Sequence, residues 1–369
     1  MKPNNTSPFV ANLFRVAAPR TGNAVLSPHS VAVALGIIAL GACGETLKSL
    51  LQILRLNSLS DLQTTIATDE ASFRSEQKDG FQYESDTSIW INNKYRALWR
   101  YRHNVKKVLR AHIQRISMDE EGRAAINRHV ADVTHDLIPE ILKLPLCPSN
   151  ILVATNALWL KAKWAMPFDP DRTSQQTFHA PKQDVAVPFL RQTACFAFLH
   201  WRDIDAIRLP YAGENVDFIV ILPHRNISLT SIEQNQLDML VGCFQDNKSE
   251  ENRLIDVSIP KLSLAFQNDL DDALKSIGGD LVFSDRADFS KIAKTDQPIM
   301  LSKIVHDVHV CLDEQGTEAA AATGEYLYLG SLRPPRPKVF CVNRPFLFLV
   351  RHRKTGAILF LGRVEDPTT

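Results

Sequence analysis

Ten residues near the C-terminal end have types and spacing suited to entering a β-sheet rather than to catalysing a reaction. Residues 314–323 read Glu-Gln-Gly-Thr-Glu-Ala-Ala-Ala-Ala-Thr. A strand that enters the middle of a sheet is buried on both faces, so small side chains fit where large ones would overpack. Gly316 can act as a hinge because glycine adopts backbone angles that other residues avoid. The pattern predicts a segment that can slide between two existing strands; a short helix or a flexible linker is the alternative.

The rest of the chain carries no motif for catalysis, metal binding or cofactor binding. We find no nucleophile elbow, no metal-ligand histidine pair and no phosphate-cradling glycine loop. The six cysteines are widely spaced and include no Cys-x-x-Cys pair, which argues for free thiols in a reducing compartment. We therefore predict a protein that is not an enzyme and that needs neither a metal nor another cofactor. The cysteines are Cys43, Cys147, Cys195, Cys243, Cys311 and Cys341.

Composition indicates a globular protein that works in water. The 369 residues are 45% hydrophobic and 22% charged, and the net charge of +1 argues against nucleic acid as the main partner. Residues 1–12 lack the apolar core of a signal peptide, and the longest apolar stretch, residues 31–42, is too short to span a bilayer. We expect a cytoplasmic monomer without a membrane partner, and non-classical secretion to the extracellular space stays open.

Hydrophobic periodicity places helices mainly in the first half and strands mainly in the second, which predicts an α+β fold. No linker or repeat divides the chain, so residues 1–369 are expected to form a single domain. Three prolines in residues 332–338 predict an exposed, extended segment after the small-residue run. Helices are expected at 7–17, 28–40, 46–54, 100–112 and 122–137, and strands at 83–91, 152–160, 196–200, 216–222, 254–259, 304–312, 346–352 and 358–363.

The order of these features resembles the serpin family of protease inhibitors, and the resemblance covers nearly the whole chain. The tail, residues 340–346, and the missing signal peptide are most similar to the intracellular, ovalbumin-like clade B branch. Two departures are Ala162, where the family usually has glycine, and His129, where it usually has tryptophan. Fragments that fit in family order are residues 23–30, 41–46, Ile126, Asn127, Thr134, 155–157, Lys161, Trp164, Phe168, 209–211, 221–223, 287–290, Ser302, Lys303, His306, 344–348 and 360–363.

The resemblance implies three β-sheets, one of them a large central sheet, and an exposed reactive-centre loop at about residues 314–338. It also implies a suicide mechanism. A protease attacks a bond in the loop and forms an acyl-enzyme; the cut loop then inserts into the central sheet and traps the protease. The target protease is therefore the expected partner, bound covalently.

Three groups of residues take roles in that mechanism by resemblance. A proline or an unpaired charge at Thr317 would block entry into the sheet, and no such residue is present. A buried polar cluster under the parting strands, the shutter, can re-form after the strands separate. The hinge is Glu314, Gly316, Thr317, Glu318, Ala319, Ala320, Ala321, Ala322 and Thr323; the shutter is Ser27, Ser30, Asn156 and His306; the breach, where insertion begins, contains Trp164 and Glu314.

The reactive bond follows from counting along the loop. The family's usual spacing from Glu314 gives Gly330–Ser331, which suits elastase-like proteases. A count one residue shorter gives Leu329–Gly330, which suits chymotrypsin-like or cathepsin G-like pockets, and a longer count gives Ser331–Leu332. Papain-like cysteine proteases prefer a bulky apolar residue before the cut. Leu329, before Gly330, fits that preference, so inhibition of a cysteine protease is an open alternative. A non-inhibitory chaperone or carrier is a further alternative, against which the hinge residues argue.

One stretch of the chain is strongly basic. Residues 87–118 contain no acidic residue, and Arg102, Lys106 and Arg110 repeat with the spacing of one helix face. Such a stripe could bind a sulfated glycosaminoglycan through charge and counterion release. The alternative, which we favour, is a solvated face whose charges pair with carboxylates elsewhere.

Overall fold

Helices dominate the N-terminal part of the chain, as the apolar periodicity predicted. The computed structural model describes residues 7–76, 81–109, 111–243, 251–295, 298–317 and 336–369. Helix α2 is buried almost all round, and Ser27 caps its N-terminus by accepting a hydrogen bond from the Ser30 amide. The helices are α1 (Ser7–Ala17), α2 (Pro28–Gly41), α3 (Gly44–Ile53), α4 (Leu59–Glu76), α5 (Trp99–Asn104), η1 (Val105–Leu109), α6 (Glu120–Val133), η2 (Pro170–Arg172), α7 (Leu229–Asn235), α8 (Leu237–Cys243), α9 (Asp271–Leu274), η3 (Lys275–Gly279) and η4 (Asp280–Phe283).

Two predicted helices are wrong at their C-terminal ends. The helix expected over residues 122–137 ends at Val133, before His135 and Asp136, whose φ angles are positive. The helix expected over residues 100–112 is α-helical only to Asn104 and continues as a π-helical turn to Leu109. His112 already belongs to a strand, because Ile113 and Ile116 lie in a parallel ladder with β2 (Phe81–Asn92). The π-helical turn also changes the helical spacing on which the predicted basic stripe depended.

The strands form two hydrogen-bonded networks in the described part of the chain. The central sheet has six strands, in the order β10-β11-β4-β2-β3, with β12 pairing with β4. Adjacent strands of this sheet are antiparallel, except for the parallel pairs β11–β4 and β2–β3. These strands are β2 (Phe81–Asn92), β3 (His112–Ile116), β4 (Leu152–Lys163), β10 (Leu262–Asp269), β11 (Leu301–Leu312) and β12 (Gly316–Thr317).

The second network has nine strands, in the order β1-β15-β14-β8-β7-β6-β9-β13, with β5 pairing with β6. We expected three sheets, but among the described residues the two smaller ones are continuous. The cause is β6, whose 18 residues pair with β5 and β9 along most of their length and with β7 at the far end. The strands are β1 (Ala24–Leu26), β5 (Ser174–His179), β6 (Asp184–Trp201), β7 (Ile204–Pro210), β8 (Val216–Pro223), β9 (Glu251–Pro260), β13 (Lys338–Cys341), β14 (Phe346–His352) and β15 (Ile358–Val364).

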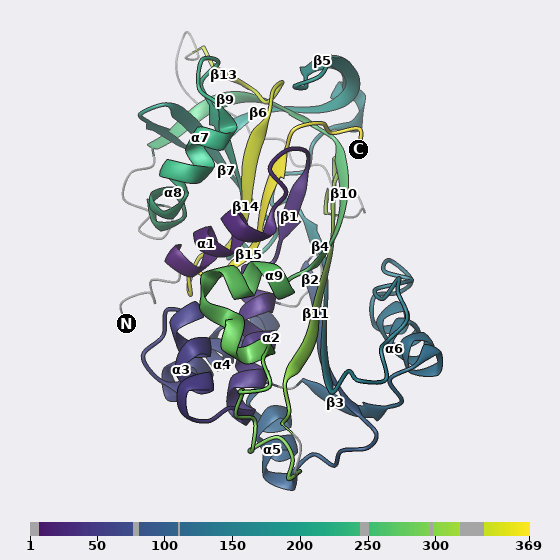
Figure 1. Cartoon of the computed structure of the whole chain (residues 1–369). Helices are drawn as coiled ribbons and strands as arrows, with labels where there is room; N and C mark the ends of the chain where they lie inside the picture. The colour runs from purple at the N-terminus through teal and green to yellow at the C-terminus, as the bar shows by residue number, and fades with distance from the viewer. Residues whose placement is uncertain (1–6, 77–80, 110, 244–250, 296–297, 318–335) are drawn as a thin grey trace.

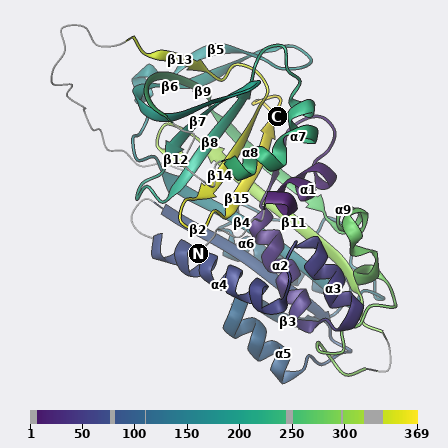
Figure 2. The same cartoon turned by 90° about the vertical axis from the view of Figure 1, so that its left-hand side faces the viewer.

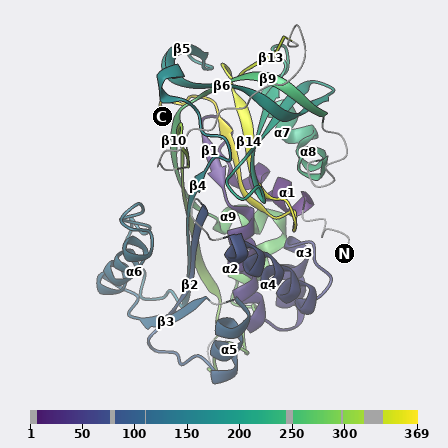
Figure 3. The ribbon, with the colours of Figure 1, turned by 180° about the vertical axis from the view of Figure 1, so that it is seen from behind.

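The central sheet separates two groups of helices. Helix α6 lies on one face of the sheet, and α2, α3 and α4 lie on the other (Figures 1 and 3). Strands β5, β13, β6 and β9 gather at the end of the molecule far from α5 (Figure 2). The α+β class is confirmed, since both sheets and both helix layers contribute to the buried core. Within the described residues, no helix has the length and apolarity to cross a membrane.

Candidate functional site

The central sheet parts at one end, between β11 and β4. The two strands pair in parallel along residues 301–309 of β11 and 152–159 of β4. Beyond this ladder, β12 pairs antiparallel with β4, so that Thr317 lies opposite Ala162. The other edge of β4 is already taken by β2 over its length. Strand β12 therefore starts between β11 and β4, which is where a strand from the hinge would enter.

A tight turn reverses the chain between β11 and β12. The Asp313 amide donates to the Gly316 carbonyl at 2.9 Å, and the Asp313 carboxylate accepts from the Gln315 amide at 2.8 Å. Gly316 has φ +143°, and a Cβ atom there would lie 1.9 Å from the carbonyl oxygen of Ala162. Only glycine allows this close approach of the two backbones.

Trp164 and Glu314 hold this turn in place. Trp164 stacks on Tyr211 with 4.7 Å between ring centroids, and its indole Nε1 donates to the Asp313 carbonyl at 2.9 Å. Glu314 is buried and makes an ion pair of 2.7 Å with Lys261 and a 2.8 Å hydrogen bond from Thr173. Burial alone would raise the pKa of Glu314, but these bonds hold it below its usual value. The two predicted breach residues thus meet at the mouth of the parting strands.

The four predicted shutter residues form one fully buried, hydrogen-bonded cluster below that mouth. His306 on β11 and Asn156 on β4 are direct neighbours in the parallel ladder. The Asn156 carbonyl oxygen accepts from the Ser30 hydroxyl at 2.7 Å, and its amide donates to the Thr87 hydroxyl at 2.8 Å. The cluster therefore ties β11, β4 and β2 to helix α2 at the level where the sheet would part.

The hydrogen bonds of His306 fix its protonation state. The Ser27 backbone amide must donate, so His306 Nε2 accepts this bond of 3.0 Å. Its Nδ1, 2.6 Å from the Asn156 side-chain oxygen, must then carry the proton. The imidazole is neutral, in agreement with burial, which lowers the pKa of His306 to about 3. A second proton would place two donors against each other at Ser27.

Helix α6 covers the opposite face of the sheet beside the parting strands. Ile126 and Val130 of α6 pack in one apolar cluster with Trp90 and Val153 of the sheet. His129 lies 3.2 Å from Asp86 on β2 and packs edge-on against Trp90. The hydrogen bond with Asp86 raises the pKa of His129 despite partial burial. At this departure from the family pattern, a hydrogen bond joins the helix to the sheet.

Several predicted residues lie outside the described part of the chain. Of the hinge, Glu314, Gly316 and the backbone of Thr317 are described. The remaining hinge residues (Glu318, Ala319, Ala320, Ala321, Ala322 and Thr323), both versions of the reactive bond (Gly330–Ser331 and Leu329–Gly330) and Arg110 are not.

Sequence reasoning missed four polar partners of the site. Thr87, and Ser85 two residues before it, contact the shutter from β2; their small hydroxyls in a strand flanked by apolar residues are a signal that could have revealed them. Lys261 and Thr173 contact Glu314 across long sequence separations, and no local pattern marks them.

The basic stretch surrounds two cavities beside α5. One, of about 310 Å³, is lined by Arg96, Arg102 and Arg115, and the other, of about 690 Å³, by Arg102, Lys106 and the 74% exposed Trp99. Arg102 lines both. In the portion of the chain that the structure describes, no ion pair involves these four cations, so the carboxylate partners that we had favoured are not seen there.

Comparison with known proteins identifies one family over nearly the whole chain. The family model described as serpin (serine protease inhibitor) matches residues 4–367. The chain is 30% identical to an uncharacterized serpin-like protein of Thermococcus kodakarensis, over 99% of this chain and 85% of that protein. It is also 30% identical to Serpin B6 of Macaca fascicularis, over 97% of both chains.

Three solved structures share the fold over nearly the whole chain. Tengpin, a thermophilic serpin in the native state, has a TM-score of 0.90 at 25% identity and covers 98% of this chain and 93% of its own. Thyroxine-binding globulin with thyroxine has a TM-score of 0.87 at 25% identity, with 99% of both chains covered. Native protease nexin-1 with heparin has a TM-score of 0.85 at 26% identity, with 98% of both covered.

Proposed function

The chain belongs to the serpin family, and from this premise we propose that it is an inhibitory serpin that traps a serine protease by inserting its cleaved loop into the central sheet. The observation that carries the proposal is β12, whose Thr317 pairs with Ala162 at the mouth between β11 and β4. A carrier such as thyroxine-binding globulin shares the fold, so the fold by itself does not separate the two functions.

Continuing the register of β12 gives the path of insertion. Counting on from the Thr317–Ala162 pair, Ala319 would face Leu160, Ala321 would face Leu158, and Thr323 would face Asn156. Paired residues of neighbouring strands point to the same face of a sheet. Leu158 and Leu160 are fully or almost fully buried in the core, so alanine suits the space beside them. The register supports the small-residue run as the inserting strand.

Insertion exchanges one ladder of hydrogen bonds for two. The parallel ladder between β11 and β4 opens, and the new strand pairs with both neighbours. Strands lie about 4.8 Å apart, so the bond between His306 and Asn156 must break. Thr323 would then bring a hydroxyl next to Asn156. The shutter groups on β11 and on β4 would thus each find a hydrogen-bond partner on the new strand between them.

The covalent step requires only the ordinary reaction of a serine protease with a peptide bond. The protease serine attacks the carbonyl carbon of Gly330 or of Leu329; an ester forms, and the following amine leaves with a proton. Gly330–Ser331 would suit an elastase-like enzyme and Leu329–Gly330 a chymotrypsin-like one, with a papain-like cysteine protease as the cross-class alternative. Insertion must be faster than hydrolysis of the ester for inhibition to result.

Thr317→Arg tests the proposal directly. Thr317 already pairs with Ala162 in the intact protein, and full insertion of the strand would enclose its side chain between β11 and β4. An enclosed charge costs several kcal/mol, so insertion should slow and the protein should become a substrate. We expect the fraction of protease recovered as a covalent complex, measured on denaturing gels, to fall at least about tenfold while cleavage continues. Thr317→Ser is the matched control and should retain the complex. Equal complex formation by Thr317→Arg and the unmodified protein would contradict the insertion path.

Mass spectrometry of the peptide released from the complex identifies the reactive bond. Pancreatic elastase, chymotrypsin and a cathepsin L-type enzyme are the three probes. A C-terminal fragment that begins at Ser331 assigns Gly330–Ser331, and one that begins at Gly330 assigns Leu329–Gly330. Clean cleavage by all three without complex formation would favour the carrier alternative.

Free thiols support a site of action inside the cell. All six cysteines are free, and two of them, Cys147 and Cys195, are exposed. Exposed thiols persist in a reducing compartment and oxidise outside it. We therefore propose that the protein acts in the cytoplasm, with non-classical secretion to the extracellular space as the alternative, and fractionation of expressing cells tests this proposal.

A second candidate function is binding of a sulfated glycosaminoglycan to the basic stretch. It is favoured by the cations that line the two cavities beside α5 without an ion pair among the described residues. Protease nexin-1, which shares the fold, is known in complex with heparin. Arg102→Ala should lower the salt concentration that elutes the protein from heparin, because one released counterion is lost. Lys275→Ala, a cation paired with Asp272, is the control and should elute unchanged.

A further inference from the structure

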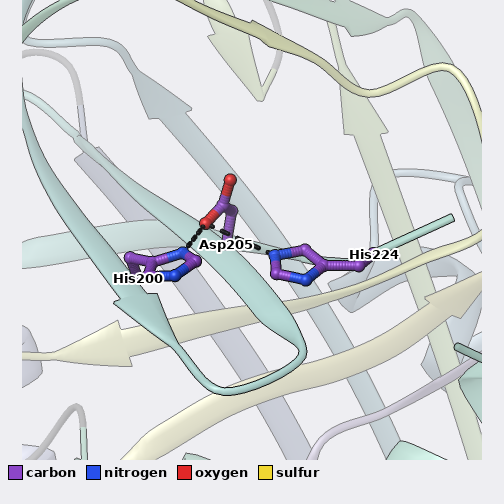
Figure 4. A group of neighbouring side chains, drawn as sticks. All are labelled: His200, Asp205 and His224. Atoms are coloured by element: carbon purple, nitrogen blue, oxygen red, sulfur yellow. Dashed lines mark hydrogen bonds and ion pairs between the residues drawn. The ribbon is translucent and has the colours of Figure 1, made fainter. Parts of the chain in front are cut away.

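Two histidines and one aspartate converge on the surface away from the parting strands. His200 is the residue before the last in β6, Asp205 is the second residue of β7, and His224 directly follows β8 (Figure 4). Their ligand atoms all lie within 4.8 Å of one another. His200 Nδ1 is 2.6 Å and His224 Nε2 is 3.7 Å from the same carboxylate oxygen of Asp205, Oδ1. Neither the inhibitory mechanism nor the basic stretch uses these residues.

The backbone under this triad is fixed by strand pairing. His200 lies directly opposite Asp205 in the antiparallel ladder between β6 and β7, so both side chains project from the same face. The His224 amide donates to the Asp203 carbonyl at 2.8 Å, which anchors the third residue to the same hairpin. The two imidazole rings stack with their centroids 5.6 Å apart. The three donors are therefore held together before any ligand arrives.

A fourth residue orients the carboxylate without occupying the shared oxygen. The Lys338 ammonium lies 3.4 Å from Oδ2 of Asp205 and 3.8 Å from the centre of the Phe198 ring. Oδ1, which both histidines face, stays on the side of the imidazoles. Groups that position a ligand in this way contribute to metal affinity. Lys338 is the first residue of β13, the strand that follows the proposed reactive-centre loop.

We propose that His200, Asp205 and His224 form a binding site for a divalent transition-metal ion, with Zn²⁺ as the expected occupant. Two imidazole nitrogens and one carboxylate oxygen suit Zn²⁺, whereas Ca²⁺ and Mg²⁺ prefer oxygen ligands alone. Ligand atoms about 2.0–2.1 Å from one tetrahedral zinc ion lie about 3.3 Å apart. The present separations, which reach at most 4.8 Å, require shifts of up to about 1.5 Å. The His200 side chain is exposed and that of His224 is half-buried, so both imidazoles have room to move. The fourth position faces solvent and would hold water.

Titration of the full chain with zinc chloride in a calorimeter tests the site. The thiols are first blocked with iodoacetamide, so that the exposed cysteines do not bind the ion. We expect one saturable site, with the affinity lowered at least about tenfold by His200→Asn, His224→Asn or Asp205→Asn. The side chains of His200 and His224 are 63% and 34% exposed, so these two changes should leave the fold intact, as a melting curve will show.

A similar histidine–aspartate pair provides the control. His179 lies 2.9 Å from Asp184 on an exposed hairpin, and no third donor joins them among the described residues. His179→Asn should leave zinc affinity unchanged. Cobalt(II) gives a second reading: the unmodified protein should develop visible absorption bands that His224→Asn abolishes. Absence of zinc binding, or equal affinity of the His200→Asn and His179→Asn proteins, would overturn the proposal.

Discussion

At the scale of single residues, the neutral His306 sets the chemistry of the parting sheet. It accepts from Ser27 and donates to Asn156, and the two bonds leave no room for a second proton. The hydrogen bonds of the shutter should therefore be stable in neutral solution and weaken in acid. The same two bonds link β11 to β4 and to the segment that enters α2. Protonation would therefore weaken the sheet at the level where the inserting strand of the proposed mechanism would pass.

Acid should destabilise the native state through His306. Burial depresses its pKa from 6.5 to about 3, so between these values the unfolded chain binds a proton that the folded chain does not. Stability is therefore lost as pH falls through this window, by about 1.4 kcal/mol per pH unit from this residue. Urea unfolding at pH 7, 6 and 5 measures the slope. His306→Gln, which does not titrate, should show a smaller slope even if it is less stable throughout; equal slopes would contradict the assignment.

At the scale of elements, the turn from β11 into β12 places the hinge at the mouth of the sheet. Its position depends on Gly316, because the backbone of β4 comes too close for any side chain. Trp164 and Glu314 then fasten the turn from both sides. The segment predicted to be the hinge is thus held at this position by contacts that are present in the intact protein.

Gly316→Ala should displace this turn. A Cβ atom at position 316 would lie 1.9 Å from the Ala162 carbonyl oxygen, so β12 must separate from β4. We expect a loss of about 2 kcal/mol in the free energy of unfolding, together with faster hydrogen exchange at the Trp164 amide, which donates to Gln315. Gly213→Ala is the control, since Gly213 also has a positive φ, +85°, but its nearest neighbour lies 3.9 Å away. A similar loss in both variants would show that the positive φ angle, and not the close approach to Ala162, causes the loss in the free energy of unfolding.

Elements with strong periodicity could be predicted from the sequence, and weakly patterned ones could not. Ser7–Ala17 and the strand pair at the C-terminal end, β14 and β15, agree with the predicted ranges. Helix α4, Leu59–Glu76, was missed because it buries only a few side chains, and the end of α5 was misplaced because a π-helical turn leads straight into β3. The shutter residues were recognisable by resemblance, whereas Lys261 and Thr173 meet Glu314 only in three dimensions.

At the scale of the whole molecule, the proposed mechanism makes the intact protein less stable than its cut form. Two ladders replace one when the strand inserts, and the core gains the small side chains of the hinge. One residue of the loop would reduce this gain in the stability of the cut form. In the continued register Glu325 would face Ala154, on a side of the sheet where Leu152 and Ile304 belong to the apolar core. A buried carboxylate without a partner there costs several kcal/mol.

Glu325→Leu should therefore stabilise the cut form and leave the intact form unchanged. Removing the buried charge should raise the melting temperature of the cut protein by roughly 5 °C. Glu318→Gln is the matched control, because in the same register Glu318 would lie on the opposite face, paired with Lys161, and should produce no rise. Unchanged melting of the cut Glu325→Leu protein would mean that insertion stops before this residue or follows another register.

The most direct test of loop insertion is the melting temperature of the intact protein compared with that of the protein cut once within residues 318–335. An added strand contributes on the order of ten hydrogen bonds at about 1 kcal/mol each. We therefore expect the cut protein to melt roughly 10–15 °C higher than the intact one, and cut Thr317→Arg to show a much smaller rise. If the cut protein melts at the same temperature as the intact protein, or lower, the loop does not insert and the inhibitory mechanism proposed for this chain is wrong.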